Sequence, residues 1–255
     1  MPNHRRNQII EELTKNEKVE IDDLASKFQV SAMTIRRDLA HLEEQEKIVR
    51  TTGGAILKKN LVSESSIYVK DEKFKAQKRK IALKAIQMIN DGTTILLDSG
   101  TTTFEIAQLL KHFNNITVIT NDIRIAASLL DTNVRVIVTG GELQNSVGAL
   151  FGPLTEHMLQ EIHVDLFFLG AHAVDTRLGV MAPTYEKASI KQKMIMAAKK
   201  TWLVADSSKF SERAFTKVCQ LNELTGIVTD HHLSPILVQE LSDIVQVTIT
   251  EMEDI

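Results

Sequence analysis

The sequence predicts an α/β protein in which a small helical N-terminal part with a short hairpin precedes a mostly parallel, Rossmann-like α/β domain. Three observations lead to this fold class. Short amphipathic helices fill the first sixty residues. From about residue 80 onward, apolar runs alternate with helical stretches. These runs lack polar alternation, as expected for parallel strands that are covered on both faces.

The 255 residues divide into three predicted parts. We assign residues 1–58 to the helical domain, 59–79 to a charged linker and 80–255 to the α/β domain. The net charge is −3, and the single cysteine, Cys219, cannot form an internal disulfide. The chain has no apolar run of about 18 residues and no signal peptide. The sequence therefore predicts a cytoplasmic protein with no membrane partner.

The helical domain is predicted from the spacing of its apolar residues. That spacing indicates a first helix over about Arg5–Lys15. Val19 and Ile21 form a short extended bridge before a second, shorter helix. Ser31 is a good N-cap, because its hydroxyl can accept from a free backbone N–H, and it begins a third helix over about Ala32–Gln45.

The phase of the third helix separates core from surface. Ile35, Leu39 and Leu42 fall on one face and are predicted to pack on the first two helices. The opposite face carries two arginines near the helix N-terminus, which suits contact with base edges in a major groove. The candidate DNA-binding residues of this helix are Ser31, Met33, Thr34, Arg36 and Arg37.

Residues 48–57 read as two short strands around a Gly-Gly turn. Gly53 and Gly54 are expected to supply the positive φ of a tight hairpin. The candidate DNA-binding residues of this wing are Arg50, Gly53 and Gly54. The alternative is a small helical subdomain whose arginines are merely solvated. The order helix–turn–helix–hairpin favours double-stranded DNA as the partner. A net charge of only +1 over the first sixty residues argues against strong non-specific binding.

The run Val-Ser-Ala-Met-Thr-Ile-Arg-Arg-Asp-Leu at 30–39, with Thr-Gly-Gly-Ala at 52–55, resembles the winged helix–turn–helix of the DeoR family of bacterial transcriptional regulators. The resemblance continues through the C-terminal part and covers nearly the whole chain. It implies operator DNA as a partner. Because winged helices normally bind operators as two-fold related copies, we expect a homo-oligomer, either a dimer or a tetramer.

In the α/β domain, each predicted strand ends in a polar or glycine-containing segment. The predicted strands are Thr94–Leu97, Ile116–Thr120, Val134–Thr139, Asp165–Leu169, Trp202–Ala205 and Gly226–Thr229. The predicted helices before and between the first of them are Ile81–Ile89, Phe104–His112 and Ile123–Leu130. Ligands of parallel sheets bind beyond the carboxyl ends of the strands, so the polar segments form one candidate site.

The first of these segments, Asp98–Thr103, carries hydroxyls and a glycine in front of a helix. The positive end of that helix makes it a candidate phosphate site. Lys209 is expected to supply a counter-charge, and Asp98 and Asp206 to accept hydrogen bonds from sugar hydroxyls. The alternatives are a well-capped βα turn and an ordinary surface lysine.

In the DeoR family such segments recur at these places. The family's domain is related in fold to ribose-5-phosphate isomerase and typically senses a phosphorylated sugar. The resemblance therefore implies effector-binding roles for Asp98, Ser99, Gly100, Thr101, Thr102, Thr120, Asn121, Gly140, Gly141, Glu186, Lys191, Asp206 and Lys209. Gln144 stands where many relatives carry arginine, and His172 where glycine or a small polar residue is more usual. Either difference bears on effector choice.

Two function classes remain. The first is a repressor of a sugar-metabolism operon whose DNA binding is modulated by a phosphorylated sugar. The second is a sugar-phosphate isomerase fused to a DNA-binding module. The related isomerases carry an Asp-Gly-Ala-Asp-Glu run for catalysis, whereas residues 169–173 here are Leu-Gly-Ala-His-Ala. We therefore expect a regulator without enzymatic activity.

We expect no cofactor and no metal. The sequence has no Walker-A run and no dinucleotide fingerprint. The nearest candidate metal ligands are His231, His232 and Cys219, and none of them has a second ligand pair at zinc spacing.

Overall fold

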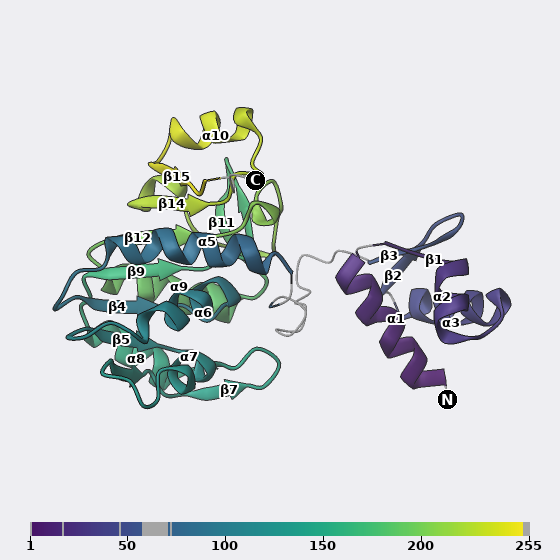
Figure 1. The fold of residues 1–255 in the computed structure, drawn as a ribbon, viewed down its shortest axis with the longest axis horizontal. Coiled ribbons are helices and arrows are strands. Elements are labelled where there is room, and N and C mark those ends of the chain that lie inside the picture. Colours follow the sequence, from purple (N-terminus) through teal and green to yellow (C-terminus); the bar gives the residue numbers. More distant parts are fainter. Residues whose placement is uncertain (1, 17, 46, 58–70, 72, 252–255) are drawn as a thin grey trace. The chain divides into compact units, whose positions relative to one another are not determined.

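The computed structural model describes residues 2–16, 18–45, 47–57, 71 and 73–251. The chain divides into two compact units, Met1–Lys73 and Phe74–Ile255 (Figure 1). Most of the predicted linker, 59–79, lies outside the described residues, which leave out 58–70 and 72. Each unit has its own buried core.

The first unit combines three helices with a small sheet. Its elements are α1 (Pro2–Asn16), β1 (Lys18–Glu20), α2 (Ile21–Phe28), α3 (Ala32–Glu44), β2 (Ile48–Arg50) and β3 (Gly54–Leu57). α1 begins at Pro2 rather than Arg5, because proline is well tolerated in a first helical turn. α2 ends at Phe28, and the C-cap residue Gln29 has a φ of 52°, which turns the chain out of the helix. Ser31 caps α3 as predicted.

The core of this unit comes from all three helices and the strands. Its members are Ile9, Leu13, Val19, Ile21, Leu24, Ile35, Leu39, Leu42, Ile48 and Ala55. The predicted phase of α3 is therefore confirmed, because Ile35, Leu39 and Leu42 are all buried.

The wing is a three-stranded antiparallel sheet in the order β1-β3-β2. The expected positive φ at Gly53 and Gly54 is wrong, because neither glycine lies in that region. Gly54 is needed for a different reason. A Cβ at Gly54 would lie 1.8 Å from the carbonyl oxygen of Val19, so only glycine lets β1 approach β3 this closely.

The second unit contains the elements from α5 onward. They are α5 (Lys75–Ala85), η1 (Ile86–Met88), β4 (Thr94–Leu97), α6 (Thr101–Leu110), β5 (Thr117–Thr120), α7 (Ile123–Ser128), β6 (Arg135–Val138), β7 (Glu142–Gln144), β8 (Ala149–Phe151), α8 (Pro153–Glu161), β9 (Leu166–Leu169), β10 (Ala173–Asp175), β11 (Gly179–Ala182), α9 (Tyr185–Ala197), β12 (Thr201–Val204), η2 (Ser207–Lys209), β13 (Thr216–Cys219), η3 (Leu221–Glu223), β14 (Gly226–Thr229), α10 (Pro235–Ser242) and β15 (Val247–Ile249).

Seven parallel strands form the central sheet, in the order β15-β14-β12-β9-β4-β5-β6. All six predicted strands belong to it, and β15 is an additional edge strand. The predicted α/β class with a mostly parallel sheet is confirmed. Two small antiparallel sheets accompany it, β10-β11-β13 and β7-β8. No helix in the described part of the chain is long and apolar enough to cross a bilayer.

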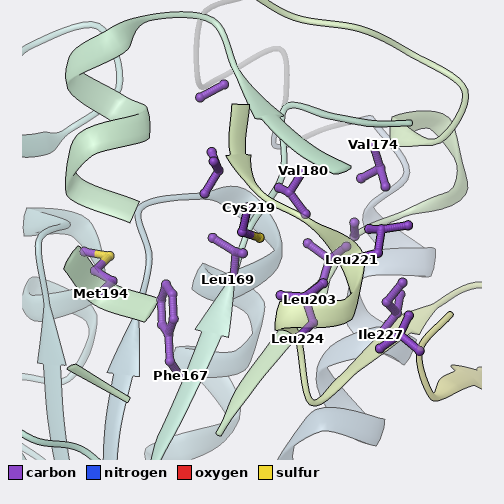
Figure 2. Packing of buried hydrophobic residues seen from close by; sticks show 14 of the residues in the cluster. Phe167, Leu169, Val174, Val180, Met194, Leu203, Cys219, Leu221, Leu224 and Ile227 are labelled. Atoms are coloured by element: carbon purple, nitrogen blue, oxygen red, sulfur yellow. The ribbon is translucent and has the colours of Figure 1, made fainter. Parts of the chain in front are cut away.

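Successive residues of each central strand face opposite cores. Phe167 and Leu169 pack with α8, α9 and α10 on one face (Figure 2), whereas Leu166 and Phe168 pack with α5, α6 and α7 on the other. Because both faces are covered by helices, every position of β9 is apolar and buried.

Two helices begin earlier than predicted. α5 begins at Lys75 instead of Ile81, and its first turns are too polar to show an apolar period. α6 begins at Thr101 instead of Phe104, directly after Gly100. The earlier start brings the hydroxyl-bearing residues into the first turn of α6.

Candidate functional sites

The exposed face of α3 is the first candidate site. The side chains of Met33, Arg36 and Arg37 are exposed, with Met33 at 56%. Neither arginine forms a hydrogen bond or an ion pair with any described residue, so both guanidinium groups are available. Ser31 accepts from the backbone N–H of Thr34 at 3.2 Å, and their hydroxyls lie 3.0 Å apart. The structure thus gathers the predicted residues of this helix at its N-terminal half.

The wing residues differ in accessibility. Arg50 ends β2 and is tied to α3, because its N–H donates to Glu43 at 3.0 Å and its guanidinium lies 3.8 Å from the same carboxylate. Gly53 is exposed, whereas Gly54 is buried beneath β1. Arg50 and Gly53 can therefore reach a ligand from this face, and Gly54 serves the sheet.

Sequence reasoning missed a buried carboxylate in α3. Asp38 is only 2% exposed and accepts from the Nε atoms of Arg5 at 2.6 Å and Arg6 at 2.9 Å. A signal was present, since Asp38 lies next to the core residue Leu39 on a helix whose phase is known. A charged residue at such a position needs partners. Nothing in the sequence pointed to Arg5 and Arg6 as those partners.

The second candidate site lies at the carboxyl end of the central sheet. β4 and β9 are neighbours there, while the strands on either side continue in opposite directions, β5 and β6 one way and β12, β14 and β15 the other. Such a switch point is where parallel sheets bind ligands. We call the polar residues gathered there the switch-point cluster, and they are Asp98–Thr103, Asn121, Gly170, Lys191, Asp206 and Lys209.

Asp98 and Lys191 are brought together across this switch point. Asp98, 2% exposed, accepts from the N–H of Gly170 at 3.0 Å and from the ammonium group of Lys191. Lys191 also donates to the carbonyl oxygen of Gly170 at 2.8 Å. Lys191 reaches this point from α9, more than 90 residues away in the chain. The two opposite charges neutralise each other, and their bonds link the ends of β4 and β9 to α9 at the centre of the cluster.

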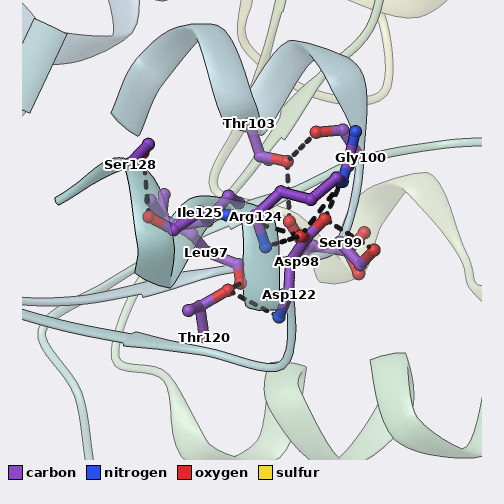
Figure 3. A network of polar contacts seen from close by, with 10 residues as sticks. All are labelled: Leu97, Asp98, Ser99, Gly100, Thr103, Thr120, Asp122, Arg124, Ile125 and Ser128. Carbon is purple, nitrogen blue, oxygen red and sulfur yellow. Dashed lines mark hydrogen bonds and ion pairs between the residues drawn. The ribbon is translucent and has the colours of Figure 1, made fainter. Parts of the chain in front are cut away.

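The loop after β4 leaves backbone donors without partners. No side chain caps α6, and the N–H groups of Thr101, Thr102 and Thr103 donate to no described residue. The hydroxyl of Thr103 turns back to the carbonyl oxygens of Asp98 at 2.6 Å and Gly100 at 3.0 Å (Figure 3). These free donors lie at the positive end of a ten-residue helix, an arrangement that can accept an anion.

Residues after β5 close one side of the cluster. The Thr120 hydroxyl is fully buried and donates to the carbonyl oxygen of Leu97 at 2.9 Å, so it serves the strand end. Asn121 donates from Nδ2 to the carbonyl oxygen of Leu150 at 3.2 Å. Its Oδ1 is buried without a partner and can accept a hydrogen bond. α7 is capped by Asp122, not by Asn121.

Asp122 and Arg124 were not predicted, although they stabilise a predicted residue. Asp122 is fully buried and accepts from the Ser99 hydroxyl at 2.9 Å and from Nη2 of Arg124 at 2.7 Å (Figure 3). The Arg124 guanidinium also lies 5.5 Å from the centre of the Phe104 ring. The Ser99 hydroxyl is therefore oriented by this network.

Residues after β12 close the other side. Asp206 is 1% exposed, and its Oδ1 accepts from the N–H of Ser208 at 3.2 Å. Its Oδ2 is buried without a partner. Lys209 is half-buried in η2; its backbone N–H donates to the carbonyl oxygen of Asp206 at 3.0 Å, and its ammonium group forms no hydrogen bond or ion pair with any residue that the structure describes. The segment 206–209 thus holds a carboxylate oxygen without a donor, Oδ2 of Asp206, and an ammonium group without an anion, that of Lys209.

Asp230, also not predicted, holds that segment in place. It is fully buried at the end of β14 and accepts from the N–H groups of Ser207 at 2.7 Å and His232 at 3.0 Å. Burial raises the pKa of Asp230, but these hydrogen bonds outweigh it and hold the pKa below its usual value. Among the described residues, no group of three or more His, Cys, Asp or Glu side chains could hold a metal ion.

Three predicted residues lie apart from these contacts. Gly140 and Gly141 are exposed, with φ of 71° and 112°. A Cβ at Gly141 would lie 2.3 Å from the carbonyl oxygen of Phe151, so glycine is required where the β7-β8 hairpin returns. Glu186 is exposed in the first turn of α9, and its carboxylate bonds to no described residue.

Gln144 and His172, the two positions expected to bear on effector choice, differ in accessibility. Gln144 ends β7 and is exposed, and its carbonyl oxygen accepts from the N–H groups of Val147 and Gly148. His172 is half-buried in the segment after β9. Of these two residues, only His172 follows the carboxyl end of β9, one of the two strands at the switch point.

Both parts of the chain match the same family. The profile described as "DeoR-like helix-turn-helix domain" matches residues 5–60, and "DeoR C terminal sensor domain" matches 73–231. The chain is 36% identical to the putative aga operon transcriptional repressor of Escherichia coli O157:H7, over 89% of this chain and 85% of that protein. It is 30% identical to the glycerol-3-phosphate regulon repressor of Escherichia coli K12, over 94% and 95%. A solved ribose 5-phosphate isomerase A from Methanocaldococcus jannaschii is 17% identical, with a TM-score of 0.40 over 53% of this chain and 54% of that one.

Proposed function

The chain belongs to the DeoR family of transcriptional regulators, and from that membership we propose that it represses a sugar-metabolism operon under the control of a phosphorylated sugar. We assign residues 1–58 to DNA binding, 59–79 to a connection, and 80–255 to effector binding and self-association as a dimer or tetramer. The two relatives are named as repressors, of the aga operon and of the glycerol-3-phosphate regulon. We place the protein in the cytoplasm, where operator DNA lies.

The exposed half of α3 supports the DNA-binding half of the proposal. Arg36 and Arg37 have guanidinium groups that no described residue engages, and an arginine can bind guanine through two hydrogen bonds. In this proposal Arg50 and Gly53 on the wing contact the sugar-phosphate backbone of the DNA. Such contacts fix the register of the protein on the duplex and do not read its sequence.

One observation carries the effector half: free donors and free buried acceptors occur together at the switch point. The phosphate binds the uncapped first turn of α6, with Lys209 as counter-charge. The sugar hydroxyls donate to Oδ2 of Asp206 and Oδ1 of Asn121, the two buried acceptors that lack partners. A phosphorylated polyol satisfies both ends of this arrangement, whereas a simple anion satisfies only one.

Regulation requires that the effector bind the DNA-competent and DNA-incompetent arrangements with different affinities. By linkage, operator DNA must then change effector affinity by the same factor. Measuring effector binding with and without operator DNA gives an independent check of the proposed coupling.

The DNA-binding half is tested with Arg37→Ala. If Arg37 contacts a base, its loss weakens operator binding by about 1–3 kcal/mol in a shift assay at fixed salt. Arg135→Ala, which removes an exposed arginine from β6 in the other unit, is the matched control. Equal affinities for Arg37→Ala and the unmodified chain would contradict the assigned face of α3.

The effector half is tested by thermal shift of the full chain against phosphorylated sugars and the corresponding free sugars. A ligand at a hundred times its Kd stabilises the folded protein by about 2.7 kcal/mol. We expect a shift with a phosphorylated sugar and a much smaller one with its free form. Equal shifts for both forms would contradict the phosphate site.

We propose that the switch-point cluster binds without turnover. An isomerase needs a free carboxylate base near the substrate carbon. Asp98 is already occupied by Lys191 and the N–H of Gly170, and residues 169–173, Leu-Gly-Ala-His-Ala, contain no acid. Asp206 keeps one free oxygen, which this proposal assigns to a sugar hydroxyl. An assay with pentose and hexose phosphates decides the point. Clear conversion by the purified chain would establish the isomerase alternative.

A further inference from the structure

Asp38 in α3 joins two arginines from α1 in one buried charge cluster. Its Oδ2 accepts from Nε of Arg5 at 2.6 Å and its Oδ1 from Nε of Arg6 at 2.9 Å. The carboxylate is 2% exposed, and both of its oxygens are occupied. We call these three residues the Asp38 clamp, and it carries a net charge of +1.

The two arginines use only part of their hydrogen-bonding capacity in this clamp. Arg5 and Arg6 are each bound through Nε alone, and their Nη groups bond to no described residue. Their side chains are 19% and 22% exposed, so neither arginine is fully enclosed by the protein. A guanidinium presents its donors as a fixed fork that matches a phosphate group.

The clamp borders the proposed reading face of α3. Asp38 is one helical turn beyond Thr34 and directly follows Arg37 in the chain. Because they bind Asp38, Arg5 and Arg6 lie beside the part of α3 that would enter a major groove. In that arrangement the two arginines lie where the phosphates that flank the groove would be. Fixing these two side chains before binding lowers the conformational entropy lost on binding.

We propose that Arg5 and Arg6 bind the DNA backbone beside α3 and that Asp38 is a positioning residue that aims them. This inference rests on the proposed function, because it assumes that the first unit binds DNA. The alternative is a purely structural ion pair that fastens α1 to α3, as buried charges often do. The two accounts differ in how DNA affinity depends on salt.

The test uses the full chain and a mixed-sequence DNA duplex of about 30 base pairs, titrated from about 50 to 200 mM salt. Each phosphate contact adds about one unit to the slope of log K against log salt, so Arg5→Gln and Arg6→Gln should each lower it by about one. Arg135→Gln removes the same charge from an exposed position in the other unit and should leave the slope unchanged. Arg5→Lys and Arg6→Lys keep the charge but replace the planar guanidinium fork with a single ammonium group, so they cover the case that a glutamine variant does not fold.

Asp38→Asn separates positioning from charge. Removing a negative charge from a DNA-binding unit would by itself tighten binding, whereas loss of the clamp should weaken it several-fold at equal salt. Glu44→Gln, which removes a well-exposed carboxylate at the end of the same helix, is the matched control and should not weaken binding. Thermal unfolding shows which variants are folded at the temperature of the titration.

The outcomes separate this inference from the proposed function. If the arginine variants, lysine variants included, bind DNA with unchanged affinity and slope while Arg37→Ala loses operator affinity, the clamp is structural only and the inference is wrong. If the unmodified chain binds neither this duplex nor any operator fragment, the proposed function fails and the inference with it. Lowered slopes with an unchanged Arg135→Gln control support the inference.

Discussion

Lys209 is half-buried, and its ammonium group has no hydrogen-bond or ion-pair partner among the described residues. Burying a charge without a partner is costly, so such a lysine is typical of a site that awaits an anion. We predict that Lys209→Ala leaves DNA affinity intact and blunts the response of DNA binding to the effector. A shift assay titrated with effector measures this, and Lys199→Ala, at an exposed lysine, is the control. A normal response in Lys209→Ala would remove Lys209 from the phosphate site.

Asp230 makes the stability of the second unit depend on pH. Its pKa is below the usual value because hydrogen bonds from Ser207 and His232 outweigh the effect of burial. A carboxylate with a lowered folded-state pKa stabilises the protein fully above its unfolded pKa, about 3.9, and loses that contribution as pH falls through the folded pKa.

We therefore predict that Asp230→Asn is less stable than the unmodified chain at pH 7, and that this difference shrinks as the pH is lowered below about 4. Urea unfolding at several pH values measures it. Asp243→Asn, at an exposed carboxylate, should show a small and nearly constant difference. A difference for Asp230→Asn that does not change with pH would contradict this account.

At the scale of elements, the wing depends on the closeness of β1 and β3. A Cβ at Gly54 would overlap the carbonyl oxygen of Val19, which is backbone and cannot move aside cheaply. We predict that Gly54→Ala destabilises the first unit by about 1–3 kcal/mol or more, as overpacking does.

Gly53→Ala is the matched control for that prediction. Its Cβ would meet only the carboxylate end of Glu20, a flexible side chain that can rotate away. Urea unfolding of both variants measures the contrast. Equal stabilities would mean that β1 can shift without cost.

The sequence was informative about elements whose apolar period is strong. Helices α1 to α3 and six strands of the central sheet follow patterns of apolar residues that depend only on local order. These strands are β4, β5, β6, β9, β12 and β14. The small strands β7, β10 and β15 are three residues each, too short to show a period. The start of α6 was predicted late because threonines in a first turn look like loop residues.

The candidate site was predictable only to the extent that strand ends imply it. Asp98, Asn121 and Asp206 follow apolar strands, and parallel topology brings such positions together. The side chain of Lys191 comes from the middle of a helix, and only the resemblance pointed to it. Asp122 was missed because its role depends on which hydroxyl and which guanidinium reach it.

For the whole molecule, the decisive feature is that the two units have separate cores. The core of Met1–Lys73 shares no residue with those of Phe74–Ile255. Ligands that bind only one unit should therefore stabilise that unit directly.

We predict that calorimetry of the full chain resolves two unfolding transitions, one raised by operator DNA and the other by a phosphorylated sugar. Any effect of one ligand on the transition of the other unit measures their coupling. The Arg37→Ala variant should lose the response to operator DNA, and the Lys209→Ala variant should lose the response to the phosphorylated sugar. A single transition raised equally by either ligand would contradict separate units.

The alternation of the central strands between two cores has an evolutionary consequence. Nearly every residue of strands such as β9 is committed to packing, so substitutions there endanger folding. The groups proposed to recognise the effector lie instead in segments that begin after the strands end. Lineages built on this scaffold can therefore acquire a new effector by changing a few residues along one edge while inheriting the framework unchanged.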